Sequence, residues 1–257
     1  MPNTEETYTY KRTSVGDLLL DVHRDEDAVS PMPAILFLHG GAFKEGSRKE
    51  CGHGYIYTRR GYAVISIDYR LLPDVTLPSI IDDVRDALYW IRDRGPEFAG
   101  VDPNRVGIVG RSAGGYLALM AGTFDSPPKV IGSYYGFGNI ERFQHEAWFK
   151  LGGYHPAWSI EGGSKRADDR LINRYSPAQL VKAGYPPTIL LHGTADSMIS
   201  CDESEQMADR LEEVGVEHRL ITVPDAEHGF DGFLGPGELS LKEQAIEDKL
   251  DFLYQYL

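Results

Sequence analysis

The stretch "VGIVGRSAGGYLALMAG", residues 106–122, places a nucleophilic side chain where a strand pattern becomes a helix pattern. Its serine, Ser112, lies between Gly110 and Gly114 in the sequence G-R-S-A-G. A serine on a tight strand-to-helix turn is held with its Oγ exposed above the sheet, and the side chains beside it must be small for the turn to close. The glycines therefore predict a turn that presents the Ser112 hydroxyl to an incoming carbonyl group. The alternative is a structural serine that caps the helix beside packing glycines.

A base and an acid that could activate this hydroxyl follow two later apolar runs. A serine hydroxyl is nearly inert at neutral pH and needs a base within hydrogen-bond reach. His228 comes just after the run in "LITVPDAEHGF", and Asp196 comes just after the run in "ILLHGTADSM". His228 would take the Ser112 proton and later give it to the leaving group, while Asp196 would fix the imidazole tautomer and stabilise the imidazolium. Asp202 and Asp231 are weaker candidates for the acid.

Backbone N–H groups that could bind the oxyanion formed by this attack follow an earlier apolar run. The sequence "LHGGAF" (38–43) continues from the run that ends at Leu38, and its successive glycines let N–H groups point into a cleft. Such donors stabilise the negative oxygen of a tetrahedral intermediate. Gly41 and Ala42 could therefore join the N–H of Ala113, and alanine suffices at position 42 because the donors belong to the backbone. The alternative is that the two glycines form only a loop.

The elements that must position these groups alternate along the chain. Six runs nearly continuous in Val, Ile and Leu predict parallel strands covered on both faces, at 33–40, 62–69, 105–110, 129–137, 187–193 and 218–223. Residues 7–12 and 17–23 predict an antiparallel hairpin at the sheet edge, with Gly16 near the turn. Apolar stripes of helical period predict helices over 80–91, 200–215 and 240–257, the second starting at a capping box of Ser200 and Glu203. We therefore expect one α/β domain over residues 1–257, with a doubly wound, mostly parallel eight-stranded sheet.

One segment, residues 138–176, interrupts this alternation. It has no strand pattern and is rich in large aromatic side chains, among them Trp148 and Trp158. One interpretation is a surface excursion fixed by aromatic packing. The other is a small lid or cap over a ligand pocket, because structureless segments of this length inside compact domains are often functional.

Composition and charge exclude several classes of function. The 257 residues carry a formal net charge of −13, which repels phosphate backbones and anionic membranes, so we expect no nucleic-acid partner. No window approaches the roughly 20 apolar residues of a membrane span, and "MPNTEETYTYKRTSVGD" lacks a secretory pattern. Cys51 and Cys201 are far apart and expected to be reduced, which favours a cytoplasmic location.

We expect neither a metal nor an organic cofactor. The sequence "HEAWF" (145–149) begins like the zinc motif H-E-x-x-H, but Phe149 occupies the second ligand position. Other clusters with metal-ligand spacing and Gly-rich phosphate loops are missing from the sequence. His192, before Gly193, is expected to shape the turn that precedes Asp196.

Five motifs in order, H-G-G-A-F, "IDYRLLP", G-R-S-A-G-G, "HGTAD" and "EHGF", resemble the α/β-hydrolase superfamily. Within it the chain is similar to the hormone-sensitive-lipase-like carboxylesterases and to bacterial and fungal esterases of feruloyl or acetyl type, over roughly residues 17–257. The resemblance implies a catalytic triad of Ser112, Asp196 and His228, in the chain order usual for this fold. It also implies an oxyanion hole of Gly41, Ala42 and Ala113.

Two features depart from the hormone-sensitive-lipase-like pattern. Many members carry an acidic residue before the nucleophile, where this chain has Arg111, and the sheet pattern begins too early for an N-terminal helical cap. These departures favour the smaller feruloyl- or acetyl-esterase-like branch, or the arylformamidase-like branch, with residues 138–176 as the only lid.

The expected function is that of a serine esterase, which cleaves short-chain or aryl and acetyl esters through an acyl-enzyme intermediate. We expect Phe43, Arg111, Trp148 and Trp158 to contact the small-molecule ester. For Arg111 there are two interpretations: a surface ion pair, which is favoured, and a preference for substrates with an acidic group near the scissile carbonyl. Two alternatives stay open: an arylformamidase or other amidase with the same triad, and a non-catalytic ligand-binding relative. The free edge of the last strand would also allow a homodimer.

Overall fold

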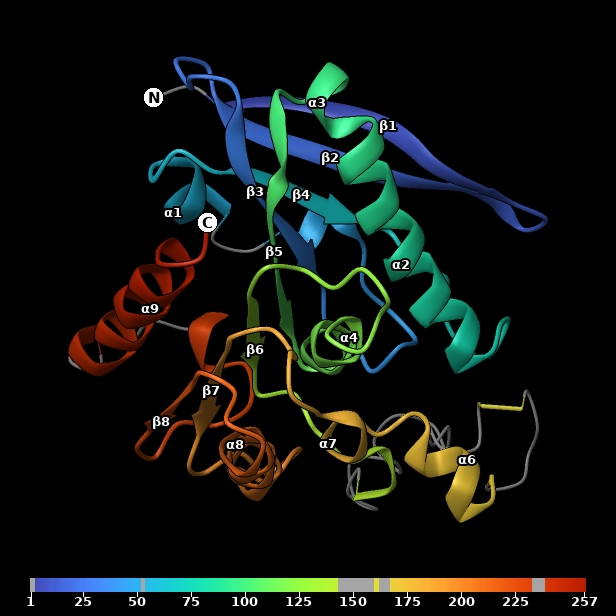
Figure 1. Ribbon diagram of the computed structural model, residues 1–257, viewed down its shortest axis with the longest axis vertical. Coiled ribbons are helices and arrows are strands. Elements are labelled where there is room, and N and C mark those ends of the chain that lie inside the picture. Colours follow the sequence, from blue (N-terminus) through green and yellow to red (C-terminus); the bar gives the residue numbers. More distant parts are fainter. Residues whose placement is uncertain (1–2, 52–53, 143–159, 162–166, 233–238) are drawn as a thin grey trace.

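The fold is built on an eight-stranded sheet, described here from a computed structural model that places all residues except 1–2, 52–53, 143–159, 162–166 and 233–238 (Figure 1). The strand order is β1-β2-β4-β3-β5-β6-β7-β8. The strands are β1 (Asn3–Thr13), β2 (Gly16–Asp25), β3 (Met32–Leu38), β4 (Ala63–Ile67), β5 (Val101–Arg111), β6 (Ile131–Tyr134), β7 (Thr188–Gly193) and β8 (His218–Val223). β1 and β2 form an antiparallel hairpin, β2 also pairs antiparallel with β4, and the remaining neighbours are parallel. The predicted α/β-hydrolase sheet is thus confirmed.

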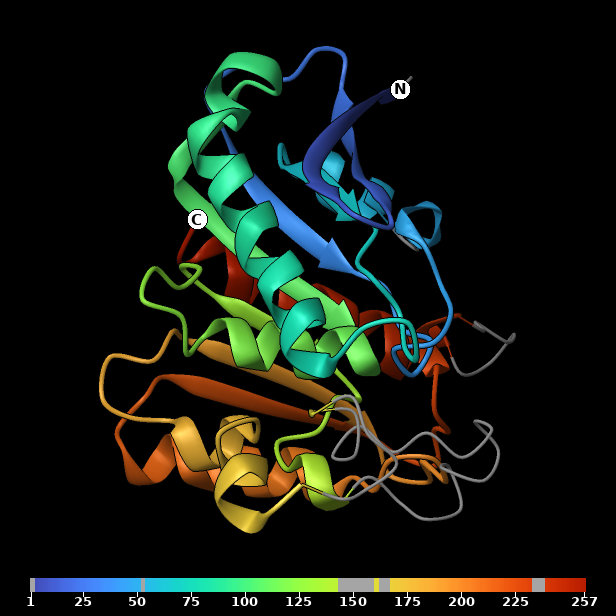
Figure 2. The ribbon, with the colours of Figure 1, turned by 90° about the vertical axis from the view of Figure 1, so that its right-hand side faces the viewer.

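Helices cover both faces of this sheet. Figure 2 shows α2 (Leu77–Asp93) and α4 (Ala113–Ala121) in front of it and α9 (Leu239–Tyr254) behind it. α8 (Asp202–Glu213) packs its apolar residues into the same core as α2 and α4, while α1 (Gly54–Thr58) shares the opposite core with α9. The remaining short helices are α3 (Gly95–Phe98), α6 (Asp169–Asn173), α7 (Pro177–Leu180), η1 (Arg48–Glu50), η2 (Ile140–Arg142) and η4 (Phe230–Gly232).

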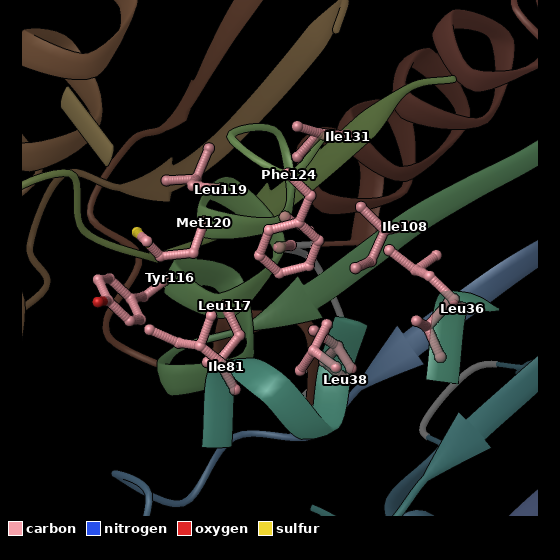
Figure 3. Close-up of a cluster of buried hydrophobic side chains, with 14 of the residues drawn as sticks. Leu36, Leu38, Ile81, Ile108, Tyr116, Leu117, Leu119, Met120, Phe124 and Ile131 are labelled. Carbon is pink, nitrogen blue, oxygen red and sulfur yellow. The ribbon is translucent and has the colours of Figure 1, made fainter. Parts of the chain in front are cut away.

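The two cores follow from the alternation of side chains along each strand. In β3, Leu36 and Leu38 point into the core shared with α2 and α4, while Ile35 and Phe37 point into the core shared with α9. Figure 3 shows the first of these cores, in which Leu36 of β3 lies beside Ile108 of β5, and Leu117 of α4 lies beside Ile81 of α2. Because both faces are buried, the central strands are apolar at nearly every position.

Some predicted strand ends differ from those observed. The run 129–137 yields only the four residues of β6, because Tyr135 adopts a φ of 37°, which turns the backbone out of the sheet. Of the expected lid, residues 138–176, the structure describes 138–142, 160–161 and 167–176, which contain η2 and α6 and lead directly into α7. Trp148 and Trp158 lie outside the described residues.

The capping box expected at Ser200 and Glu203 is not formed. The N-cap position of α8 belongs to Cys201, and the Ser200 hydroxyl accepts only a long hydrogen bond from the N–H of Asp202 (3.4 Å). Glu203 is buried and accepts a hydrogen bond from the N–H of Asn139 (3.1 Å), so it anchors the start of the 138–176 segment.

Candidate active site

The structure brings Ser112, His228 and Asp196 into one hydrogen-bonded row. The Ser112 hydroxyl lies 3.0 Å from His228 Nε2, and His228 Nδ1 lies 2.7 Å from Asp196 Oδ2. Their loops follow β5, β8 and β7, three parallel strands whose carboxyl ends lie at the same edge of the sheet. Since the carboxylate can only accept, Nδ1 carries the proton and Nε2 is free to accept from the hydroxyl.

Ser112 occupies a strained turn that only its glycine neighbours allow. Its φ of 52° and ψ of −118° lie outside the regions that non-glycine residues ordinarily adopt. A Cβ on Gly110 would lie 2.0 Å from the carbonyl oxygen of Gly114. A Cβ on Gly114 would lie 2.4 Å from the carbonyl oxygen of Leu38. The predicted tight turn is therefore confirmed, and it leaves no room for a side chain on either glycine.

Asp196 is held as a carboxylate by donors on both oxygens. Oδ1 accepts from the N–H groups of Met198 (2.9 Å) and Ile199 (2.8 Å), and Oδ2 accepts from His228 and lies 3.2 Å from Nε2 of His192. Burial alone would raise the pKa of Asp196, but these hydrogen bonds outweigh it and lower the pKa below its ordinary value. The carboxylate therefore stays ionised at neutral pH.

His192 holds the loop of Asp196 in place through its hydrogen bonds. It is fully buried; its Nε2 donates to the carbonyl of Ile199 (2.9 Å), and its Nδ1 accepts from the hydroxyl of Ser204 (2.7 Å). Its position at the turn agrees with the expected structural role. Its contact with Asp196 Oδ2 could not be read from the sequence.

Asp231, the rival acid, pairs with Arg111 instead of with His228. Its Oδ2 lies 2.7 Å from Arg111 Nε, and its Oδ1 accepts from the Tyr135 hydroxyl (2.5 Å). Burial alone would lower the pKa of Arg111, but Asp231 raises it above its ordinary value, so the guanidinium stays charged. The other rival, Asp202, is the first residue of α8, and the residues that bind His228 do not include it.

Gly41 and Ala42, two of the three proposed oxyanion donors, line a cavity of about 310 Å³ in front of Ser112. Gly41 and Ala42 have φ values of 99° and 53°, and among the described residues no backbone carbonyl accepts from their N–H groups. The N–H of Ala113 opens α4 and so has no acceptor within that helix. Other lining residues are Glu45, Glu50, Arg111, Tyr135, Met198, Ile199 and His228. No sequence pattern indicated that Tyr135, Met198 or the two glutamates line the cavity.

One expected contact residue lies elsewhere. Phe43 is fully buried, and its ring packs edge-on against Tyr116 (centroids 5.6 Å apart) and Phe137 (6.3 Å). The prediction that Phe43 contacts substrate is therefore wrong, because the turn at Ala42 directs the next side chain into the core.

The residues that the structure places form no metal site, no disulfide and no membrane-spanning helix. That part of the chain holds no group of His, Cys, Asp and Glu arranged to bind a metal ion. Cys51 and Cys201 are both free, and burial raises the pKa of each thiol to about 11. No described helix is long and apolar enough to cross a membrane.

A family model, BD-FAE, matches residues 20–211, well over half of the chain. The chain belongs to the BD-FAE family. The matched range contains the glycine turn of Ser112, the loop with Gly41 and Ala42, and Asp196, while His228 follows it. The resemblance to hormone-sensitive-lipase-like carboxylesterases is thereby confirmed.

Individual relatives of this BD-FAE member differ widely in length. It is 30% identical to "Esterase LipC" of Mycobacterium tuberculosis, over 86% of this chain and 60% of LipC. It is 28% identical to the "Non-reducing polyketide synthase Preu6" of Preussia isomera, over 97% of this chain and 15% of the synthase. A solved structure, the thermophilic esterase Est2 of Thermogutta terrifontis, superimposes with a TM-score of 0.80 at 24% identity, covering 98% of this chain and 92% of that one. The chain thus spans 60% or less of these two curated relatives, and the Est2 match establishes the fold.

Proposed function

We propose that this BD-FAE member is a serine esterase that hydrolyses carboxylic esters through an acyl-enzyme intermediate. The observation that carries the proposal is the row Ser112–His228–Asp196, with contacts of 3.0 and 2.7 Å, at the edge of a cavity. A nucleophile, a base and an orienting acid in hydrogen-bond contact are the parts that acyl transfer needs.

The proposed reaction has two halves. Ser112 Oγ attacks the ester carbonyl carbon while His228 Nε2 takes its proton, which gives a tetrahedral intermediate with one negative oxygen. The bond to the alcohol oxygen then breaks, that oxygen receives the proton from His228, and the acyl group stays on Ser112. In the second half water adds with His228 as base, the bond to Ser112 Oγ breaks, and Ser112 regains the proton as the carboxylic acid leaves.

The negative oxygen of both intermediates would be stabilised by the N–H groups of Gly41, Ala42 and Ala113. Two of these groups belong to the loop after β3 and the third opens α4, so donors from two segments converge beside Ser112. Donors of this kind are already oriented before the reaction, which is why they lower the barrier.

The cavity supports a small acyl or aryl group on the substrate. Its volume of about 310 Å³ lies at the lower end of the range for ligand pockets. The two free thiols, Cys51 and Cys201, support the further proposal that the protein works in a reducing, cytoplasmic compartment.

The test is turnover of p-nitrophenyl acetate by Ser112→Ala, with Ser14→Ala in the exposed turn between β1 and β2 as the matched control. We expect a loss of about 10⁴-fold or more for Ser112→Ala and none for the control. A fluorophosphonate probe should label the wild type and the control but not Ser112→Ala. Unchanged turnover in folded Ser112→Ala would refute the mechanism. Faster turnover of N-formylkynurenine than of any ester in a panel from acetyl to long acyl chains would instead favour the amidase alternative.

A further inference from the structure

Arg111 and Asp231 form a buried ion pair between the loops of the nucleophile and the base. Arg111 is the last residue of β5, directly before Ser112, and Asp231 lies in η4, three residues after His228. Arg111 Nε lies 2.7 Å from Asp231 Oδ2, with side-chain exposures of 18% and 1%. The two side chains therefore join segments that are more than a hundred residues apart and that carry the two groups which must meet.

The Asp231 carboxylate is also fixed by a residue that touches the base. The Tyr135 hydroxyl donates to Asp231 Oδ1 at 2.5 Å, and the Tyr135 ring packs edge-on against the His228 ring, with centroids 4.6 Å apart. The Arg111 guanidinium lies over the Phe37 ring, 5.3 Å from its centroid. A movement of Asp231 would thus be transmitted both to Ser112 through Arg111 and to His228 through Tyr135.

The other side of the His228 loop is fixed to the Asp196 loop. Glu227, directly before His228, accepts hydrogen bonds from the N–H (3.1 Å) and the hydroxyl (3.0 Å) of Ser197, directly after Asp196. Residues next to Asp196 and Ser112 in the sequence are therefore each connected to the segment around His228. The Arg111–Asp231 pair makes the connection on the Ser112 side.

Because the pair is largely removed from water, it is expected to add little to the folding stability. Taking two charges out of water costs about as much as, or more than, their attraction returns, so a gain in stability does not by itself account for this pair. The titratable groups that interact with the pair include Cys51, Tyr57, Tyr134, Tyr135 and Lys249, and His228 contacts Tyr135.

We propose that Arg111 and Asp231 are positioning residues, whose ion pair holds the Ser112 turn and the His228 loop at the distance that proton transfer requires. This inference rests on the proposed esterase function. It assigns to Arg111 a role other than binding an acidic substrate, because its charge is matched by Asp231.

The experiment compares Arg111→Met, Asp231→Asn and the double variant with the wild type. Arg60→Met is the matched control, since Arg60 also joins two distant segments by an ion pair (2.7 Å to Asp251) whose carboxylate is 61% exposed. The double variant is needed because Arg111→Met leaves an unbalanced buried carboxylate and can fail to fold. Circular dichroism checks the fold, and kcat, KM and the pH profile of kcat/KM are measured with p-nitrophenyl acetate.

A positioning role predicts that kcat falls by about 10- to 100-fold in each folded variant while KM changes little, because misplaced reacting groups slow the chemistry and not the binding. The acid limb of kcat/KM should move to higher pH in Arg111→Met, where the carboxylate favours the protonated imidazole. It should move to lower pH in Asp231→Asn and return to the wild-type position in the double variant. Discrimination between neutral and carboxylate-bearing esters should not change in the double variant, where the local charge stays balanced.

Wild-type kcat in the folded double variant would overturn the proposal, as would an acid limb that no single variant moves. A weaker relative turnover of carboxylate-bearing esters in the double variant would overturn it in favour of substrate binding by Arg111. Failure of the esterase function itself would look different, since the wild type would then neither hydrolyse the ester nor react with a fluorophosphonate.

Discussion

Lys249 tests what it costs this protein to bury a charged side chain. Its side chain is fully buried on α9, where Nζ donates to the hydroxyls of Tyr57 (2.6 Å) and Tyr134 and lies 4.4 and 4.8 Å from the centroids of their rings. Among the described residues no carboxylate forms an ion pair with it. Burial lowers its pKa from 10.5 to about 7, with Arg111 acting in the same direction and Asp231 against it.

This lowered pKa makes stability depend on pH. Below pH 7 the lysine is protonated in both states, and the folded protein bears the full penalty of the buried charge. Between about pH 7 and 10.5 the unfolded chain binds more protons than the folded protein, so stability rises with pH across this window. Each pH unit is worth about 1.4 kcal/mol, so the whole window corresponds to about 5 kcal/mol, and the part between pH 6 and 9 to about 3 kcal/mol.

Lys249→Met should remove this dependence. The variant loses its hydrogen bonds to two tyrosine hydroxyls, which costs about 1–3 kcal/mol. At pH 6 that loss is smaller than the relieved penalty, so we expect the variant to be more stable than the wild type by about 2–4 kcal/mol. The advantage should shrink by about 3 kcal/mol towards pH 9.

The assay is urea unfolding followed by circular dichroism at pH 6, 7, 8 and 9, with Lys182→Met as the control at an exposed lysine. The quantity of interest is the difference in unfolding free energy between variant and wild type. A difference that stays constant within about 0.5 kcal/mol over this range would refute the assignment of a neutral, buried amine.

Three further predictions concern the row and the glycine turn that carries Ser112. Asp196→Asn should lower kcat by about 10⁴-fold with little effect on the fold, because the amide favours the wrong imidazole tautomer; a loss below about tenfold would contradict its role. Hydrogen bonds keep the pKa of Asp196 below its ordinary value, so the acid limb of the wild-type kcat/KM profile should not come from this carboxylate. Gly114→Ala should abolish activity and soluble expression, because its Cβ would meet the Leu38 carbonyl oxygen at 2.4 Å, whereas Gly232→Ala meets nothing within 4 Å and should be neutral; an active Gly114→Ala would show that the turn has room.

The sheet and the meeting of Ser112, His228 and Asp196 could be predicted because both depend on local pattern. Strands buried on both faces are apolar throughout, and the carboxyl ends of parallel strands share one edge, so residues just after them converge. The glycine turn could be recognised for the same reason, since a tight turn restricts the size of its own neighbours.

What the sequence could not reveal depends on contacts between distant segments. The spacing between Ser200 and Glu203 fits a capping box, but Glu203 instead accepts a hydrogen bond from the N–H of Asn139. Phe43 follows the glycines of the predicted oxyanion loop, yet the positive φ of Ala42 sends its ring into the core. The pairing of Arg111 with Asp231 joins positions 120 residues apart, and neither local pattern nor composition marks it.

The charge of the cavity lining affects the release of product after the reaction. Glu45 and Glu50 line it and are exposed, and Asp231 already balances the nearby guanidinium, so an incoming molecule meets excess negative charge. A neutral ester is indifferent to that field, but hydrolysis creates an anionic acid within it. Like charges repel over several ångströms at physiological ionic strength. The proposed reaction would therefore drive out its own acidic product, and inhibition by accumulated carboxylate should be weak and weaken further as salt is removed.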